Sequence, residues 1–188
     1  MSGPTLIDHL EEHLGAPART FEPLSPRDHR PFQVISFEGT PFPDATTLVT
    51  AGLSARPREQ SKGHNIRQEL VAATYRSRDE EELAAVVDAI GREVLTRDSA
   101  LLRGEVVGPA GPIFAGSTIE AFAYTSPWYW SDEFSRFSGL SPAVLMIWLL
   151  PLTTAEAGYV RQHGIDRFEV EINEQVPDLL DFRRPSIV

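Results

Sequence analysis

The chain has 188 residues, of which 41% are apolar and 23% are charged, so its composition is that of one ordinary folded domain with its own core. It contains no cysteine, which excludes disulfides, thiolate nucleophiles and thiolate metal sites. The 17 basic and 27 acidic side chains give a formal net charge of -10 at pH 7, which disfavours nucleic acid and anionic membrane surfaces as partners.

The N-terminal part is predicted to be a helix followed by a proline-rich strap. Leucine and isoleucine side chains recur at helical spacing within residues 5–14, and Gly15 follows as a stop signal. Prolines are frequent in residues 17–31, where they remove backbone donors that a sheet needs, so an irregular surface strap is expected. We therefore assign residues 1–30 to this N-terminal helix and strap, and residues 31–188 to the main domain.

Three strands and a long helix are predicted next. Residues 32–37 alternate apolar with polar side chains, residues 46–50 are rich in β-branched side chains, and residues 69–75 are a third candidate. Ser77 and Glu80 have the spacing of a capping box, which predicts that a helix starts there. The apolar side chains of that helix are Leu83, Val86, Val87, Ile90 and Val94.

The second half of the chain starts with two further strand predictions, at residues 104–107 and 119–125. Residues 144–150 are apolar on both faces, so we expect a central strand that is covered from two sides. Pro151 is expected to end this strand, because proline lacks the backbone N–H that a ladder uses.

Two helices are predicted near the C-terminus. Thr153 and Glu156 form a second capping box, and Gly164 is a natural stop for that helix. The apolar residues of segment 168–176 fit either a helix or a strand, and the helix is favoured. Helices and strands that share one core pack most simply as a mixed β-sheet with helices on it, so we expect an α+β fold in a single compact domain.

One possible metal site is suggested by the pattern H-x-x-E-H, formed by His9, Glu12 and His13. Such a pattern places two imidazoles on one helical face, where they can hold zinc. The sequence signals no third ligand, and both histidines lie at the margin of the apolar stripe. Ordinary helix residues are the simpler interpretation, so no metal and no cofactor is expected.

Two Gly-Leu-Ser segments, residues 52–54 and 139–141, match the first three positions of a nucleophile elbow. The closing glycine is replaced by Arg56 in the first segment and by Ala143 in the second. No histidine and acid partners are signalled for either serine. A small hydrolase that uses Ser54 is therefore kept only as an alternative.

An acid pair offers a second catalytic alternative. Asp132 and Glu133 lie close to Trp128, Tyr129 and Trp130, a combination that also occurs in sugar-binding clefts. The distance between the two carboxyl groups is not encoded in the sequence, and a packed loop or a protein contact is the more common role of such a cluster. The glycines of the chain do not have the spacing of a phosphate-binding loop, so nucleotide binding is not supported.

Two segments are candidates for contact with a protein partner. The first, residues 56–67, carries four positive charges against one negative charge, which indicates either a solvated loop or a contact with an acidic partner. The second, residues 126–137, is rich in tryptophan and tyrosine, the side chains that most often anchor interfaces, although internal packing of the loop is an equally good interpretation. The predicted contact residues are Trp128, Tyr129, Trp130, Asp132, Phe134, Arg56 and Arg58. If Trp128 or Trp130 is an anchor, one of them must be substantially exposed.

Four segments in succession resemble the suppressor of fused domain. They are residues 48–54 (LVTAGLS), residues 68–71 (QELV), the apolar strand that runs into residues 151–156 (PLTTAE), and residues 181–188 (DFRRPSIV). The resemblance implies a non-enzymatic, protein-binding α+β domain. Animal members of the family hold a transcription factor in check, and many bacterial relatives are thought to be immunity proteins. The chain is too short for the second domain of the animal protein, so a transcription-factor role is not expected.

The resemblance does not identify binding residues, and it leaves open whether segments 52–54 and 183–184 are functional or architectural. We expect a cytoplasmic protein that neutralises a toxin by binding it. The negative net charge suits a basic toxin, because opposite charge raises both association rate and specificity. The longest apolar run, residues 143–150, is too short to cross a membrane. A regulator of another cytoplasmic protein is the remaining alternative, and the oligomeric state stays open.

Overall fold

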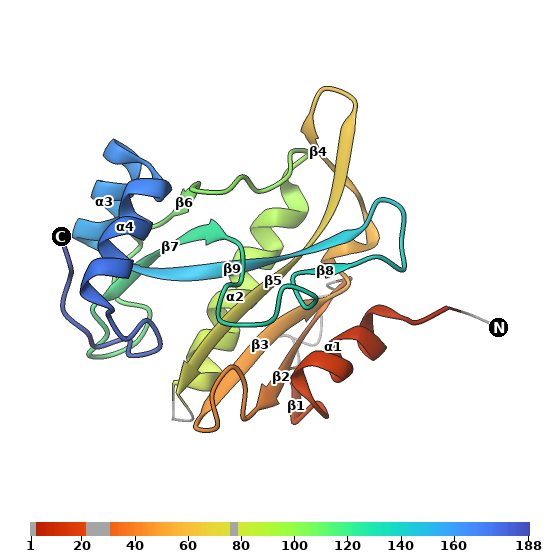
Figure 1. The fold of residues 1–188 in the computed structure, drawn as a ribbon, viewed down its shortest axis with the longest axis horizontal. Helices are drawn as coiled ribbons and strands as arrows, with labels where there is room; N and C mark the ends of the chain where they lie inside the picture. Colours follow the sequence, from red (N-terminus) through yellow and green to blue (C-terminus); the bar gives the residue numbers. More distant parts are fainter. Residues whose placement is uncertain (1–2, 22–30, 76–78) are drawn as a thin grey trace.

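The computed structural model describes residues 3–21, 31–75 and 79–188, and Figure 1 shows how its elements are arranged. The helices are α1 (Leu6–Leu14), α2 (Glu80–Thr96), α3 (Thr154–His163) and α4 (Ile165–Gln175), and a short 3-10 helix is η1 (Leu53–Ala55). The strands are β1 (Arg19–Phe21), β2 (Gln33–Glu38), β3 (Ala45–Ala51), β4 (Arg58–Ser61), β5 (His64–Tyr75), β6 (Val106–Val107), β7 (Ile119–Thr125), β8 (Arg136–Phe137) and β9 (Val144–Thr153).

The strands form one mixed sheet with helices packed on it, which confirms the predicted α+β fold in a single compact domain. The main order is β1-β2-β3-β5-β9-β7-β6, while β4 pairs with β5 and β8 pairs with β9. Only the β5–β9 pair is parallel among the strands described; the other pairs are antiparallel. The apolar strand β9 is central, as its sequence predicted.

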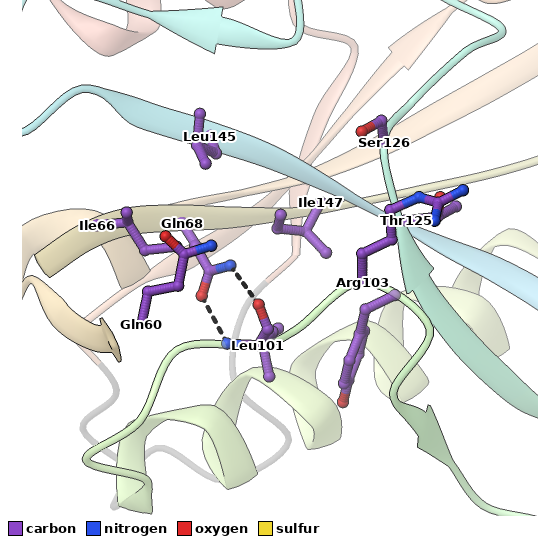
Figure 2. Close-up of a pocket in the computed structure, with 10 residues that line it drawn as sticks. Gln60, Ile66, Gln68, Leu101, Arg103, Thr125, Ser126, Leu145 and Ile147 are labelled. Atoms are coloured by element: carbon purple, nitrogen blue, oxygen red, sulfur yellow. Dashed lines mark hydrogen bonds between the residues drawn. The ribbon is translucent and has the colours of Figure 1, made fainter. Parts of the chain in front are cut away.

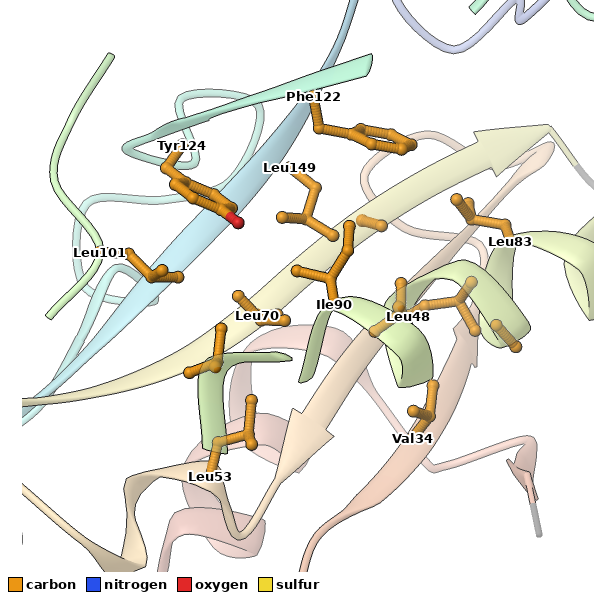
Figure 3. Packing of buried hydrophobic residues seen from close by; sticks show 14 of the residues in the cluster. Val34, Leu48, Leu53, Leu70, Leu83, Ile90, Leu101, Phe122, Tyr124 and Leu149 are labelled. Atoms are coloured by element: carbon orange, nitrogen blue, oxygen red, sulfur yellow. The ribbon is translucent and has the colours of Figure 1, made fainter. Parts of the chain in front are cut away.

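The two faces of the sheet are covered differently. Alternate side chains of a strand point to opposite faces, so Leu48 and Leu149 join the core under α2, whereas Val49 and Trp148 face the other way. Figure 3 shows the layer between α2 and the sheet, where strand residues meet side chains of the helix. The opposite face is covered by α1, the aromatic segment 126–137, α3 and α4.

Helix α1 confirms the first predicted helix and packs into the common core. Thr5 caps it: its hydroxyl accepts from the backbone N–H of Asp8, and the Asp8 carboxylate accepts from the N–H of Thr5. Leu10 is fully buried, and Leu14 nearly so, in the cluster with Phe37. The division between residues 1–30 and 31–188 stays a prediction, but α1 shares its apolar core with the sheet.

The prediction of an irregular strap is wrong for residues 19–21. These residues form β1 and pair antiparallel with residues 34–36 of β2. No proline lies between Pro17 and Pro23, so the backbone donors of this short stretch are intact and available to an edge strand. The prolines at 23 and 26 lie outside the described residues.

Helix α2 begins at Glu80, directly after Asp79, so the predicted capping box is wrong. Glu80 is the first helical residue instead of the third, and Asp79 provides no side-chain cap. Ser77 lies outside the described residues. The three glutamates of the first turn still face the positive end of the helix dipole, which favours a helix start at this place.

Pro151 does not end the central strand, because β9 continues to Thr153. Parallel pairing with β5 stops at Trp148, while antiparallel pairing with β7 continues to Thr153. Pro151 therefore lies where β9 has a described strand on one side only, and a missing N–H is tolerated at such a position.

The C-terminal helices follow the sequence prediction. Thr153 and Glu156 form the capping box of α3, and Gly164 ends it with a φ of 85°. Segment 168–176 is helical up to Gln175, as favoured. Strands β4 and β8 were not predicted, and the strand expected at residues 104–107 is limited to Val106–Val107.

Candidate interaction surface

The aromatic segment 126–137 is built around one buried ring. Trp148 of β9 is fully buried, and three rings of the segment contact it. The ring centroids of Trp128, Tyr129 and Trp130 lie 4.7, 5.0 and 5.7 Å from that of Trp148. Such edge-to-face and tilted contacts are favourable geometries for aromatic pairs, so the sheet holds the segment in a defined position.

Trp128 is the exposed member of this cluster, with 39% of its surface accessible. One of the two tryptophans is thus substantially exposed, as an anchor requires. Beside Trp128 lies a cleft of about 190 Å³ that it shares with Glu169, Ile172 and Asn173 of α4. We call these four residues the Trp128 cleft. A large aromatic edge with mixed apolar and polar neighbours is the usual chemistry of an interface anchor.

Other predicted contact residues of the segment lie deeper. Tyr129 and Trp130 are half-buried, and the indole N–H of Trp130 donates to the Thr47 hydroxyl at 3.2 Å. Phe134 is fully buried in the core beside α1, so it cannot reach a partner. Asp132 is exposed at the turn that precedes β8, where its backbone carbonyl accepts from the hydroxyl of Ser135.

The two histidines of α1 lie against the same segment. His9 is 8% exposed, and its Nε2 lies 3.1 Å from the carbonyl oxygen of Phe134. Its ring is 4.6 Å from that of His13. Burial lowers the pKa of His9. In the described part of the chain, no group of three potential metal ligands occurs, and His9 instead joins α1 to the aromatic segment.

The basic segment 56–67 forms the β4–β5 hairpin, and its cations have different roles. Arg56 pairs with Asp98 at the surface. Arg58 is only 2% exposed and donates to the carbonyls of Leu53 and Val94, so its guanidinium is used inside the protein. This burial argues against the predicted partner contact of Arg58. Burial also lowers the pKa of Arg58.

Ser54 lies in η1, whose backbone is held by one buried carboxylate. Glu69 of β5 is fully buried and accepts from the backbone N–H groups of Gly52, Leu53 and Ser54 at 2.8, 3.3 and 3.0 Å. The Thr50 hydroxyl donates to it at 2.6 Å. Ser54 itself is 3% exposed, so a substrate cannot reach its hydroxyl, and the Ser54 hydrolase alternative loses its support. The Gly-Leu-Ser segment at 52–54 is architectural.

The arginine pair of the C-terminal tail is architectural as well. Arg184 forms a bidentate ion pair with the buried carboxylate of Glu156, at 2.5 and 2.8 Å. It also donates to the carbonyl of Pro151, so the tail is fixed to β9 and α3. Arg183 pairs with Asp79 at the start of α2 and lies over the ring of Phe114. The tail is thus docked along both α3 and α2.

A second pocket, of about 140 Å³, lies between the β4–β5 hairpin and the end of β7 (Figure 2). Two of its polar side chains, Gln68 and Arg103, are already engaged. The Gln68 amide exchanges two hydrogen bonds with the backbone of Leu101, and Arg103 binds Asp166 and Glu169 of α4. The apolar side chains of Ile66, Leu145 and Ile147 complete the lining. The pocket is large enough for one side chain, and it brings no nucleophile and base together.

No described helix is long and apolar enough to cross a membrane. The family model of suppressor of fused protein (SUFU) matches residues 28–185. A search among curated proteins finds no matching relative.

Solved structures share the fold. A suppressor of fused homologue from Neisseria gonorrhoeae has a TM-score of 0.73 at 21% identity, with 97% of this chain and 94% of that chain covered. The chain of a Sufu–Fu complex has a TM-score of 0.68 at 15% identity, with 97% and 90% covered. Drosophila Suppressor of Fused has a TM-score of 0.59 at 13% identity, and the match covers 83% of this chain but only 42% of that one.

Proposed function

Because the chain belongs to the suppressor of fused (SUFU) family, we propose that it is a protein-binding domain that acts by occupying the surface of a partner. The finer proposal is an immunity protein of the cytoplasm, which neutralises a basic toxin by binding it. A related chain has been solved in a Sufu–Fu complex, which supports binding as the common theme.

The exposed ring of Trp128 is the observation that carries this proposal. It is held against Trp148 at a centroid distance of 4.7 Å and faces the cleft beside α4, so its position is fixed before a partner arrives. A prepositioned tryptophan loses little conformational freedom on binding, which is why such side chains dominate interface energies. Asp132 lies nearby in the sequence and is exposed, whereas Phe134 supports the segment from inside.

The net charge of -10 supports a basic partner. Opposite charges accelerate association and penalise acidic competitors, and both effects weaken with salt. An inhibitor of a basic toxin would benefit from each of them, because it must reach its target before the toxin acts.

The proposal is tested with the proteins encoded next to this gene. Each is produced alone and together with this chain, and cell growth and calorimetric affinity are measured. We expect one neighbour to arrest growth, the chain to restore it, and the affinity to fall as salt rises. Trp128→Ala should weaken binding by about 30-fold or more, as for other interface anchors.

The matched control is Leu140→Ala, which truncates another exposed apolar side chain and should change the affinity by less than about twofold. If no neighbouring protein binds, the immunity role is wrong. An affinity that is constant from low to high salt would contradict the argument that opposite charge attracts the partner. If Trp128→Ala binds as tightly as the wild type, the Trp128 cleft is not the contact surface.

A further inference from the structure

Among the α-helices that the structure describes, only α2 packs on its face of the sheet, over β2, β3 and β5. A helix is about 10 Å wide and neighbouring strands are about 4.8 Å apart, so α2 covers only part of a sheet of this width. Between α2 and residues 107–113 an apolar groove of about 300 Å³ remains. We call it the α2 groove. Ile90 and Phe122 belong to its lining, and Figure 3 shows both in the layer beside α2.

The helical wall of the α2 groove has a defined charge pattern. Glu82, Val86, Ala89 and Glu93 recur at spacings of four, three and four residues, so they share one side of α2. The two carboxylates are 11 residues apart, which corresponds to about 16 Å along the helix. Val86 and Ala89 line the groove between them. The wall is therefore apolar in its middle and acidic at both ends.

The opposite wall includes a run of small residues and is fixed in place. Gly108, Ala110, Gly111 and Pro112 lie along it, so another backbone can approach closely. The backbone N–H of Ala110 donates to the carbonyl of Glu120, and the side chain of Arg161 donates to the carbonyl of Gly108. The groove is thus preformed, which lowers the entropic cost of binding.

The charges of the helical wall of the α2 groove favour a cationic occupant. Within the described residues, Glu82 and Glu93 form no ion pair, and both are exposed. The arginines near this helix already form ion pairs: Arg92 pairs with Asp88, and Arg97 pairs with Glu105. A bound segment with a cation near each end would therefore meet the carboxylates of Glu82 and Glu93. Arg92 and Arg97 are held in their own ion pairs and would not repel it as free cations.

We propose that the α2 groove binds an amphipathic helical segment of the partner, with apolar side chains in its centre and a lysine or arginine near each end. The assignment rests on the proposed binding function, since it identifies a second surface that a basic partner contacts. It lies on the opposite face of the sheet from the Trp128 cleft. A partner that reaches both surfaces would hold the domain from two sides.

The probe is a synthetic peptide of about 16 residues, long enough for a helix that spans Glu82 and Glu93. It carries leucine and alanine in its centre and lysines 11 residues apart. Its binding to the full chain is measured by calorimetry, next to a scrambled peptide of the same composition. We expect Ala89→Trp, which fills the groove, to weaken binding at least 10-fold. The pair Glu82→Lys and Glu93→Lys should weaken it strongly at low salt and less at high salt.

Glu11→Lys is the matched control, because it reverses an exposed glutamate on α1 and should leave the affinity within twofold. Circular dichroism and thermal melts check the fold of each variant, and the charge variants keep the inference testable if Ala89→Trp does not fold. The inference is overturned if the wild-type chain prefers neither peptide, if the groove variants bind normally, or if Glu11→Lys weakens binding equally. A toxin that binds Ala89→Trp normally would overturn the groove assignment and leave the proposed function standing.

Discussion

Glu69 and Glu156 are both fully buried carboxylates, yet the protein neutralises them in different ways. Glu156 has a cation, because Arg184 contacts both of its oxygens. Glu69 has no described cation within hydrogen-bond distance; backbone N–H groups of residues 52–54 and the Thr50 hydroxyl donate to it instead. The first arrangement joins two oppositely charged side chains, while the second joins a charge to backbone dipoles.

Each carboxylate connects two of the segments on which the family resemblance depends. Glu69, in segment 68–71, accepts hydrogen bonds from the end of segment 48–54. Glu156, in segment 151–156, binds Arg184 of segment 181–188. The segments that carry the family resemblance are therefore the ones that these buried carboxylates connect. The candidate contact surfaces, the Trp128 cleft and the α2 groove, are built from residues outside these four segments.

The largest effect is expected where a buried charge loses the one direct counter-ion that it has among the described residues. Arg184→Met leaves the carboxylate of Glu156 buried without its cation, so the free energy of unfolding should fall by about 3–5 kcal/mol in urea titrations. The double variant Arg184→Met with Glu156→Gln should recover part of this loss, because no unpaired charge remains. A single variant that is as stable as the wild type would show that the ion pair is not what fixes the tail.

Glu69→Gln should have a smaller effect, a loss of about 1–3 kcal/mol in the same titrations. The amide keeps one acceptor oxygen, so some N–H groups of residues 52–54 lose their partner, but no contacting cation is left behind. Thr50→Val removes one donor only and serves as a graded control. If Glu69→Gln costs as much as Arg184→Met, Glu69 acts as the counter-ion of Arg58, and the contrast between the two carboxylates disappears.

The pH dependence of stability tests the same contrast. Burial raises the pKa of Glu69, although its hydrogen bonds act in the other direction. The folded state therefore binds the proton at a pH where the unfolded state has released it. This contribution to stability is largest in acid and is lost as the pH rises through the pKa of folded Glu69. We expect the stability advantage of the wild type over Glu69→Gln to grow as the pH is lowered from 7 towards 5; a constant difference would contradict it.

The smallest effect is expected at the neighbouring arginine. Arg183 pairs with Asp79, but half of the Arg183 side chain is exposed, so solvent screens the pair. Arg183→Met should therefore lower the free energy of unfolding far less than Arg184→Met does in the same urea titrations. A loss comparable to that of Arg184→Met would mean that docking of the tail on α2, and not the buried pair on α3, holds the C-terminus.

Local signals predicted much of this fold. Periodicity located α1, α2 and β2, and runs of β-branched or apolar residues located β3 and β9. The capping box at Thr153 and Glu156 is present as expected. Strands β1, β4 and β8 were missed because each has four residues or fewer and forms only by pairing with a longer neighbour. The passage of β9 through Pro151 depends on where its pairing with β5 ends, which is tertiary information.

The contact surfaces were predictable only in part. Tryptophan and tyrosine in residues 126–137 drew attention to this segment as a candidate contact surface. The sequence did not show that Trp128 is exposed while Phe134 is buried. Arg58 was grouped with Arg56 because the sequence does not show which guanidinium turns inward. The α2 groove was missed entirely: the regular spacing of Glu82 and Glu93 was available, but its opposite wall is contributed by a distant loop.

All three tryptophans of the chain belong to one cluster, since Trp128 and Trp130 both contact Trp148. The intrinsic fluorescence of this protein therefore originates from a single place next to α4. A ligand that covers Trp128 would shift or quench the emission directly, whereas one seated beside α2 would leave the spectrum nearly unchanged. The unlabelled chain thus carries its own optical reporter, which distinguishes occupancy of one side of the sheet from occupancy of the other.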